Sequence, residues 1–437
     1  MTTAAEGEEL TRVGPGTPMG ALMRQYWLPA AKSSELIAGG DPVRLMLLGE
    51  RLVAFRGPDG QVGVLDQRCP HRCASLFFGR NETGGIRCVY HGWKFAADGT
   101  CMDMPNLPPG HDFRDKVRAK AYPVTERAGV VWVYMGERSE APPMPQIEAT
   151  LLPEASVSLN FTQRECNWLQ ALEGDIDTSH FSWLHVGSVQ PEQVDPDNWL
   201  HFQVTNRAPD YHVADTDWGT MYCAYRPADG EAVYWRFAHF AFPFWTFIPQ
   251  GDMRDRVIAR AWVPMDDTHT MFVGFTWAQA SRTATLSGGR PIPGATPAPE
   301  YIPNSTAWFG RWRPVQNEAN DYLIDRAAQR TNLTYTGITH IAMQDQAITE
   351  SMGAIVDHTW EHLAPSDQMI TRTRRRLLIA ARAWQNKQTV PPCVDAPGVF
   401  SKVRSGECVL AADDWQAAYA TQLRLAKHPQ ELQAAAE

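Results

Sequence analysis

Cysteines are few, apolar runs are short and basic residues are in the minority in this sequence. Eight cysteines spread over 437 residues do not form a disulfide framework, and they fit the reducing cytoplasm. No run is long or apolar enough to cross a bilayer, and residues 1–10 lack the basic start and apolar stretch of a signal peptide. The net charge of −9 argues against the basic surface of a dedicated nucleic-acid binder. We therefore expect a cytoplasmic protein without membrane or nucleic-acid partners.

Two signatures of electron-transfer proteins are also missing. No glycine-rich dinucleotide fingerprint follows a predicted strand, and the cysteine spacing of plant-type ferredoxins does not occur. The chain therefore has no reductase signature of its own. With 44% hydrophobic and 20% charged residues, the composition is that of a globular enzyme, and the length allows two or three domains.

Two short segments each carry one cysteine and one histidine, and they are the most informative feature of the chain. One contains Cys69 and His71, and the other contains Cys88 and His91. Two such loops can close on one cofactor from opposite sides. Two thiolates and two imidazoles are the ligands of a Rieske [2Fe-2S] cluster, whose reduction potential of roughly −150 to +300 mV suits an electron relay.

A structural zinc site is the alternative, because two cysteines and two histidines also bind zinc. Zinc loops usually place both cysteines on one loop and both histidines on the other, whereas here each loop supplies one of each. The pattern therefore favours the iron–sulfur cluster. Cys73 is not needed as a ligand, and we expect it to pack beside the cluster.

The strand signals of the first third predict a small all-β domain around these loops. We expect strands over 43–48, 51–56, 61–66 and 129–134, separated by glycine-containing turns. The proline-rich run Ala141–Pro145 marks a boundary. The predicted organisation is an N-terminal segment (1–25), a cluster domain (26–145) and a second domain (146–437).

The second domain reads as an α+β mixture. We expect a helix from about 164 to 185, strands between 202 and 277, and helices from 307 onward, including 367–388 and 413–427. The segment 281–303 is rich in glycine, proline, serine and threonine. We interpret it as a surface excursion rather than a substrate-gating loop.

Asp177, His180 and His185 follow one another where the predicted helix ends. A spacing of three puts Asp177 and His180 on one helical face, but the step of five rotates His185 away. A shared site therefore needs a break or bulge between the histidines. Taken alone, one packed and one surface histidine explain the segment equally well, but beside an electron relay a Fe(II) site becomes the better interpretation.

Such an iron site needs a carboxylate from elsewhere in the chain, so that two histidines and one carboxylate leave open positions for O2. Asp345, in the predicted helix over 340–353, is our candidate. Glu350 and Asp357 are the competitors, and spacing alone does not choose between the three.

Taken together, these motifs resemble the Rieske non-haem iron aromatic ring-hydroxylating oxygenases, specifically the α (oxygenase) subunit of the phthalate dioxygenase-like group. The resemblance spans roughly the whole chain. It is carried by the two cluster segments, by Asn-Trp-Leu-Gln-Ala-Leu-Glu-Gly over 167–174 leading to Asp177, His180 and His185, and by Gln344 to Ala347.

The resemblance implies an α+β fold with a sandwich-like Rieske domain and a catalytic domain whose antiparallel sheet is flanked by helices. It implies that His180, His185 and Asp345 ligate iron in a homotrimer or stacked hexamer, where the cluster of one subunit lies near the iron of its neighbour. Asp177 would bridge the subunits, accepting hydrogen bonds from His180 and from cluster ligand His91 of the next chain.

The implied activity is aromatic hydrocarbon catabolism by a dioxygenase. Electrons would come from a separate NAD(P)H-dependent reductase of flavin and ferredoxin type, and O2 would be added to an aromatic carboxylate by cis-dihydroxylation. A Rieske monooxygenase such as an aryl ether O-demethylase is the alternative. A Rieske electron carrier without oxygenase activity is a third, but it would need only the first third of this chain.

A carboxylate substrate requires a cationic or hydrogen-bonding anchor. Arg207 and Arg236 are our candidates, with Thr178 and Ser179 near the iron. In the phthalate-type pattern a basic residue follows an Ala-Pro dipeptide, whereas here Asp210 does, which favours a monocarboxylate such as a substituted benzoate. The basic run over 372–376 is interpreted as a solvated helix face rather than a reductase-docking site.

Overall fold

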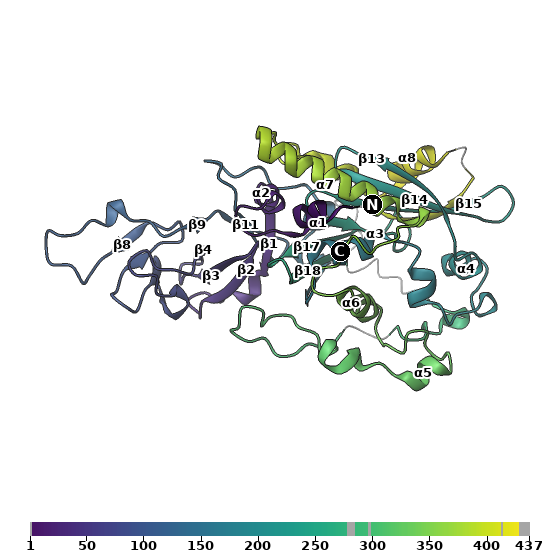
Figure 1. The fold of residues 1–437 in the computed structure, drawn as a ribbon, viewed down its shortest axis with the longest axis horizontal. Coiled ribbons are helices and arrows are strands. Elements are labelled where there is room, and N and C mark those ends of the chain that lie inside the picture. The colour runs from purple at the N-terminus through teal and green to yellow at the C-terminus, as the bar shows by residue number, and fades with distance from the viewer. Residues whose placement is uncertain (1, 278–284, 296–298, 412–413, 428–437) are drawn as a thin grey trace.

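A computed structural model describes residues 2–277, 285–295, 299–411 and 414–427. A narrow β-rich region at one end is followed by a broader region in which helices lie beside a large sheet (Figure 1). The α+β fold with an all-β first part and an antiparallel second sheet, expected from the sequence, is confirmed. No described helix is long and apolar enough to span a membrane.

Two short helices, α1 (Ala4–Thr11) and α2 (Pro18–Met23), precede the strands. Thr3 and Glu6 form a capping box at the start of α1, and Thr17 caps α2, whose first residue is proline. Both helices contact α7 (Gln368–Lys387) of the broad region. The N-terminal segment therefore packs on the C-terminal helical layer.

The strands of the narrow region form three antiparallel sheets. The hairpin predicted over 43–56 is present, and Leu48 and Gly49 at its turn both have positive φ. The predicted strands over 61–66 and 129–134 are confirmed to within a residue. The three sheets contain β1 (Trp27–Lys32), β11 (Val130–Tyr134) and β10 (Val124–Arg127); β2 (Val43–Leu47), β3 (Glu50–Arg56), β4 (Val62–Asp66) and β9 (Ala121–Tyr122); and β5 (Arg80–Glu82), β6 (Gly85–Arg87), β7 (Lys94–Phe95) and β8 (Cys101–Asp103).

The sheet of the broad region runs in the order β12-β18-β17-β16-β15-β14-β13, and β19 pairs with β15. Trp132 of β11 is fully buried against this sheet, with its ring 5.9 Å from that of Trp245 and 6.0 Å from that of Phe275. The two regions thus share one apolar core. The strands are β12 (Val157–Arg164), β13 (Asp210–Asp215), β14 (Gly219–Pro227), β15 (Val233–Ala241), β16 (Trp245–Phe247), β17 (Ile258–Pro264), β18 (Thr270–Trp277) and β19 (Gly406–Leu410).

Three predicted boundaries are wrong. Arg164 ends strand β12, paired with Thr270 of β18, and α3 (Trp168–Ile176) begins only after Asn167, whose side chain accepts the backbone N–H of Leu169. Residues 199–205 form helix α4 (Trp199–Thr205) rather than a strand. Strand β19 interrupts the predicted C-terminal helices because its backbone groups pair with β15. A pairing with such a distant strand leaves no signal in the local sequence.

The predicted start of the C-terminal helices at 307 is also wrong, because residues 307–325 form turns and a 3-10 stretch, and the first helix is the short α5 (Arg326–Arg330). The later helices are confirmed as α6 (Ile341–Ser351), α7 and α8 (Trp415–Leu425). The solvated face expected for 372–376 is wrong for Arg374, which is buried and ion-paired with Glu173 of α3. The segment 281–303 lies partly outside the described residues, so its interpretation as a surface excursion stays a prediction.

Candidate functional site: two cysteine–histidine loops and a two-histidine, one-carboxylate group

The two cysteine–histidine loops are built alike. The backbone N–H of Cys73 donates to the carbonyl of Cys69 at 2.9 Å, and the N–H of Gly92 donates to the carbonyl of Cys88 at 2.9 Å. Cys73 and Gly92 both have positive φ, 58° and 82°. Each turn therefore doubles back four residues after its cysteine and presents a thiol and an imidazole from one short loop.

The side chains of the two loops converge. The thiols of Cys69 and Cys88 are buried, and the rings of His71 and His91 lie edge to face with centroids 4.3 Å apart. His71 stacks on Trp93 at 4.4 Å, and its Nδ1 is buried without a hydrogen-bond partner among the described residues. Loss of hydration, followed by the charges of His91 and Arg72, lowers the pKa of His71, which favours the uncharged form that binds a metal. Two thiols, two imidazoles and an orphaned ring nitrogen fit a Rieske cluster.

Cys73 is exposed, whereas Cys69 and Cys88 are buried. The four-residue set expected from the sequence is thus brought together without it.

In the broad region, α3 ends at Ile176 with Asp177 as its C-cap, and residues Phe181–His185 form one turn of π-helix. A π turn closes its hydrogen bonds over five residues instead of four, so it can bring two residues five apart to the same side. The local break that a joint site for His180 and His185 requires is therefore present. Helix α6 packs against both α3 and this turn, and it carries the carboxylate.

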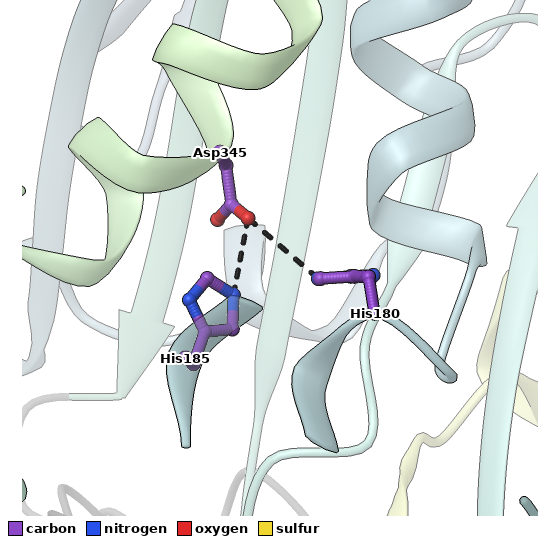
Figure 2. A group of neighbouring side chains, drawn as sticks. All are labelled: His180, His185 and Asp345. Carbon is purple, nitrogen blue, oxygen red and sulfur yellow. Dashed lines mark ion pairs between the residues drawn. The ribbon is translucent and has the colours of Figure 1, made fainter. Parts of the chain in front are cut away.

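His180, His185 and Asp345 lie together, each offering one ligand atom, and these atoms lie within 4.8 Å of one another (Figure 2). The Oδ1 atom of Asp345 is 3.1 Å from Nε2 of His185 and 3.6 Å from Nε2 of His180. His185 is buried, whereas the other two side chains are about one-quarter to one-third exposed, at 26% and 30%. The group is open on one side, as a metal site with free positions must be.

The competing carboxylates lie elsewhere. Glu350, one turn further along α6, accepts the backbone N–H of Glu165 at 2.8 Å and contacts the hydroxyl of Tyr322. Asp357 is exposed and bonded to Thr359. Asp345 is therefore the carboxylate that the fold brings to the two histidines.

The two histidines have different partners on their outer nitrogens. Nδ1 of His185 lies 2.7 Å from Oε1 of Gln344, whose amide nitrogen donates to the carbonyl of Ile338 at 2.8 Å, so the amide oxygen faces the ring. Nδ1 of His180 lies 3.3 Å from Oδ2 of Asp177. Each partner accepts the Nδ1 proton and leaves Nε2 free toward Asp345.

The charges around His180, His185 and Asp345 favour binding of a cation. Burial lowers the pKa of His180, but the hydrogen bond and charge of Asp177 and the charge of Asp345 outweigh it and raise that pKa to about 9. Burial raises the pKa of Asp345, yet the two imidazoles, followed by Arg164, lower it well below its usual range. Two carboxylates around these rings thus attract positive charge, which a divalent metal ion supplies.

A cavity of about 490 Å³ opens beside the group, between the sheet, α3 and α6. Its wall mixes aromatic, polar and charged side chains. They include Asn160, Thr162 and Arg164 of β12, Arg260 and Trp262 of β17, Phe272 of β18, and His180, His340, Ile341 and Asp345.

The predicted substrate residues are not among the described residues that line this cavity. Arg207 donates to the backbone carbonyls of Ser182 and Val189, and Arg236 to the carbonyl of Pro249. Thr178 is buried, and the hydroxyl of Ser179 donates to Asp177. Their role toward a substrate stays a prediction.

Sequence reasoning missed Arg164 as a cavity residue because it assigned residue 164 to a helix. The alternation of polar side chains at 160, 162 and 164 was the signal of a strand with one face on a cavity.

Comparisons with known proteins agree with this geometry. A family model for the Rieske [2Fe-2S] domain matches residues 26–123, and a model described as LigXa C-terminal domain like matches residues 133–436. The 3-chlorobenzoate-3,4-dioxygenase oxygenase subunit of Comamonas testosteroni is 53% identical over 96% of this chain and 98% of its own. The phthalate 4,5-dioxygenase oxygenase subunit of Pseudomonas putida is 35% identical over 95% and 94%.

Among solved structures, dicamba monooxygenase bound to 3,6-dichlorosalicylic acid superposes with a TM-score of 0.56 over 84% of this chain and 100% of its own, at 16% identity, which shows a shared fold. The Rieske match decides against the zinc alternative, and the C-terminal match decides against a stand-alone electron carrier. The chain belongs to the Rieske non-haem iron aromatic ring-hydroxylating oxygenases, as an oxygenase (α) subunit of the phthalate dioxygenase-like group with a [2Fe-2S] cluster and a mononuclear non-haem iron.

Proposed function

We propose that this chain is the oxygenase component of a multicomponent dioxygenase that cis-dihydroxylates an aromatic carboxylate, a substituted benzoate. The observation that carries the proposal is the two-histidine, one-carboxylate group facing a cavity walled by Trp262 and Phe272. The name of the 53% identical relative, a 3-chlorobenzoate dioxygenase subunit, supports the substrate class. The reaction adds both atoms of O2 to the ring and consumes two electrons and two protons.

In this proposal Cys69, Cys88, His71 and His91 hold the cluster. His180, His185 and Asp345 hold the iron. When bound, the cluster supplies single electrons and the iron supplies the open positions at which O2 is reduced beside the substrate.

The side chains around these groups have separate tasks. Gln344 and Asp177 fix the orientation of His185 and His180 through their Nδ1 atoms. Trp262 and Phe272, whose rings lie 4.9 Å apart, form an apolar wall that excludes water and orients a flat ring. His180 and Asp345, which are partly exposed and line the cavity, allow a substrate to approach the iron-binding group from the cavity side.

The chain needs partners for this reaction. We propose a separate NAD(P)H-dependent reductase and a homotrimer or stacked hexamer in which the cluster of one subunit serves the iron of the next. The cluster loops belong to the narrow end that carries β8, whereas α6 lies in the broad region, which supports transfer between subunits (Figure 1). In this proposal Asp177, which is 21% exposed and bonded to His180, accepts a second hydrogen bond from His91 of a neighbouring subunit.

Product analysis tests the function. The enzyme is supplied with NADH, a surrogate reductase, ¹⁸O2 and a panel of benzoates, phthalate isomers and methoxybenzoates. A diol that carries two ¹⁸O atoms, formed from 3-chlorobenzoate, is the expected result. A phenol with formaldehyde from methoxybenzoates, and no diol from any benzoate, would identify an O-demethylase instead.

A further inference from the structure

Arg164 is an ionic side chain in the cavity with no ionic partner among the described residues. It is 4% exposed, it ends β12, and its side chain lines the same cavity as His180 and Asp345. Its Nε and Nη1 atoms are buried without a hydrogen-bond partner in the described part of the chain. An unpaired buried charge is costly, so it indicates a site that a ligand completes.

The other arginines of the cavity lining are already neutralised. Arg260 donates to Asp175 at 2.6 Å, and Arg374 is bonded to both oxygens of Glu173 at 2.6 Å and to Glu361. Within the described lining of this cavity, Arg164 therefore carries the uncompensated positive charge. Arg226 also has two terminal nitrogens without a described partner, but it is fully buried in β14, away from the cavity lining.

The surroundings of Arg164 fix where an anion would sit. Its guanidinium lies 5.3 Å from the ring of Trp262, whose indole N–H donates to Asp175 at 3.0 Å and whose ring contacts Phe272. The cation thus adjoins the aromatic wall.

We propose that Arg164 binds the carboxylate of an aromatic monocarboxylate and holds its ring along Trp262 in front of the iron-binding group. This inference rests on the proposed function and gives it a substrate anchor. The planar fork of an arginine matches a carboxylate, and two parallel N–H···O bonds fix the orientation of the ring as well as its position. One uncompensated cation balances one carboxylate. A second carboxylate, as in phthalate, would face Asp177 and Asp345 without a counter-charge.

The test compares an acid with its neutral isostere. Binding of 3-chlorobenzoate and 3-chlorobenzamide to the enzyme loaded with cluster and iron is measured by isothermal titration calorimetry for the wild type, Arg164→Met and Arg164→Lys. We expect Arg164→Met to weaken benzoate binding by about 100-fold, the value of a lost charged hydrogen-bond pair. Benzamide binding should change by less than about 3-fold, and Arg164→Lys should fall between, since it keeps the charge without the fork.

The double variant Arg260→Met/Asp175→Asn is the matched control, because Arg260 lines the same cavity but is paired with Asp175. It should leave the benzoate-to-benzamide ratio within about 3-fold of wild type, since the pair is removed as a neutral unit and no unpaired charge is left behind. Phthalate should bind the wild type at least about 10-fold more weakly than 3-chlorobenzoate, because its second carboxylate has no partner. Phthalate binding equal to 3-chlorobenzoate binding would overturn the monocarboxylate assignment.

Three results would overturn the anchor: equal weakening of both ligands by Arg164→Met, which marks a role in packing; no change in either; or the same loss of selectivity in the double variant Arg260→Met/Asp175→Asn. The proposed function fails separately, in the ¹⁸O2 product analysis. If benzoate binds selectively through Arg164 but no oxygenated product forms, the anchor proposal stands and the proposed function fails. If the diol forms but Arg164→Met leaves the benzoate-to-benzamide binding ratio unchanged, the proposed function stands and the anchor proposal fails.

Discussion

In the proposed iron-binding group of His180, His185 and Asp345, the two histidines have different hydrogen-bond partners. His180 faces a carboxylate, Asp177, while His185 faces a neutral amide, Gln344. A carboxylate makes the attached imidazole a stronger base, whereas an amide fixes its orientation at little electrostatic cost. As the proposed iron ligands, the two rings would therefore differ, although both are histidines. His180, the more exposed of the two, carries the charged partner, and in the proposed oligomer it would lie on the side of the neighbouring subunit.

At this scale, Asp345→Ala should remove the mononuclear iron and keep the cluster. Without its carboxylate the group retains two neutral imidazoles, which bind Fe(II) weakly. Iron and acid-labile sulfide analysis should fall from about three irons per chain to about two, with sulfide unchanged. Glu350→Gln is the control and should keep about three irons, because Glu350 bonds to Glu165 and Tyr322 instead. Loss of iron in the control alone would reassign the third ligand.

The elements that carry the site depend on backbone shapes that few residues adopt. The second cluster loop turns at Gly92, whose φ is 82°, and a Cβ there would lie 2.6 Å from Cγ of Pro105. The iron-binding group depends in the same way on the π turn over Phe181–His185. In both places a local departure from regular structure, rather than a regular element, sets the direction of the ligands.

Gly92→Ala should therefore lose the cluster. The positive φ costs about 1 kcal/mol for alanine, and the clash with Pro105 must additionally shift the loop that presents His91. Visible absorbance and sulfide content should drop by more than about half relative to wild type. Gly60→Ala provides the comparison, because Gly60 has a similar φ of 86° but open space around its Cβ. Equal cluster loss in both variants would show that strain, not the contact with Pro105, decides.

At the scale of the whole molecule, the buried ion pairs tie distant parts of the chain together. Arg374 of α7 joins Glu173 of α3 to Glu361, across more than one layer of the broad region. Burial raises the pKa of Glu361, but the hydrogen bonds of Arg374 and His358 outweigh it and lower that pKa to about 2. The ionised carboxylate of Glu361 thus stabilises the fold at pH values above its ordinary pKa of 4.5. This stabilisation is lost as the pH falls from 4.5 toward 2.

Glu361→Gln should accordingly unfold at a lower temperature than wild type near pH 6.5, and the difference should shrink near pH 3.5. The narrowing corresponds to about 1 kcal/mol once the partial exposure of the carboxylate is allowed for. Melting temperatures followed by intrinsic fluorescence at the two pH values measure it. A gap that stays constant between them would mean that Glu361 acts through packing rather than charge.

The proposed arrangement of subunits makes a prediction at the same scale. A chain with Cys69→Ser lacks an intact cluster, and a chain with Asp345→Ala lacks the iron. Each should be inactive alone, whereas oligomers co-expressed from both should recover activity, because about one quarter of random neighbours pair an intact cluster with an intact iron site. Oxygen uptake with 3-chlorobenzoate measures the recovery. Transfer within one chain would leave the mixture as inactive as its parents.

The sequence predicted those elements that depend on interactions between residues close together in the chain. The strands over 43–56 and 129–134 and the helices α6, α7 and α8 were predicted because turns, caps and apolar periodicity are local signals. Arg164, α4 and β19 were misassigned because their structure depends on pairing or packing with distant segments. Arg374 was expected in solvent, since its ion-pair partner Glu173 lies 201 residues away in the chain.

The sequence by itself determined the presence of the Rieske domain and the oxygenase family, because each cluster loop holds its cysteine and histidine within four residues of backbone. Only the tertiary structure decided which carboxylate meets His180 and His185, and that Arg164 has no ion-pair partner among the described residues. Asp345 is separated from His185 by a long stretch of chain, and Arg260 and Arg374 likewise find their partners Asp175 and Glu173 on another element. The balance of charges inside a cavity depends on which side chains lie close together in space, and the sequence alone does not show this.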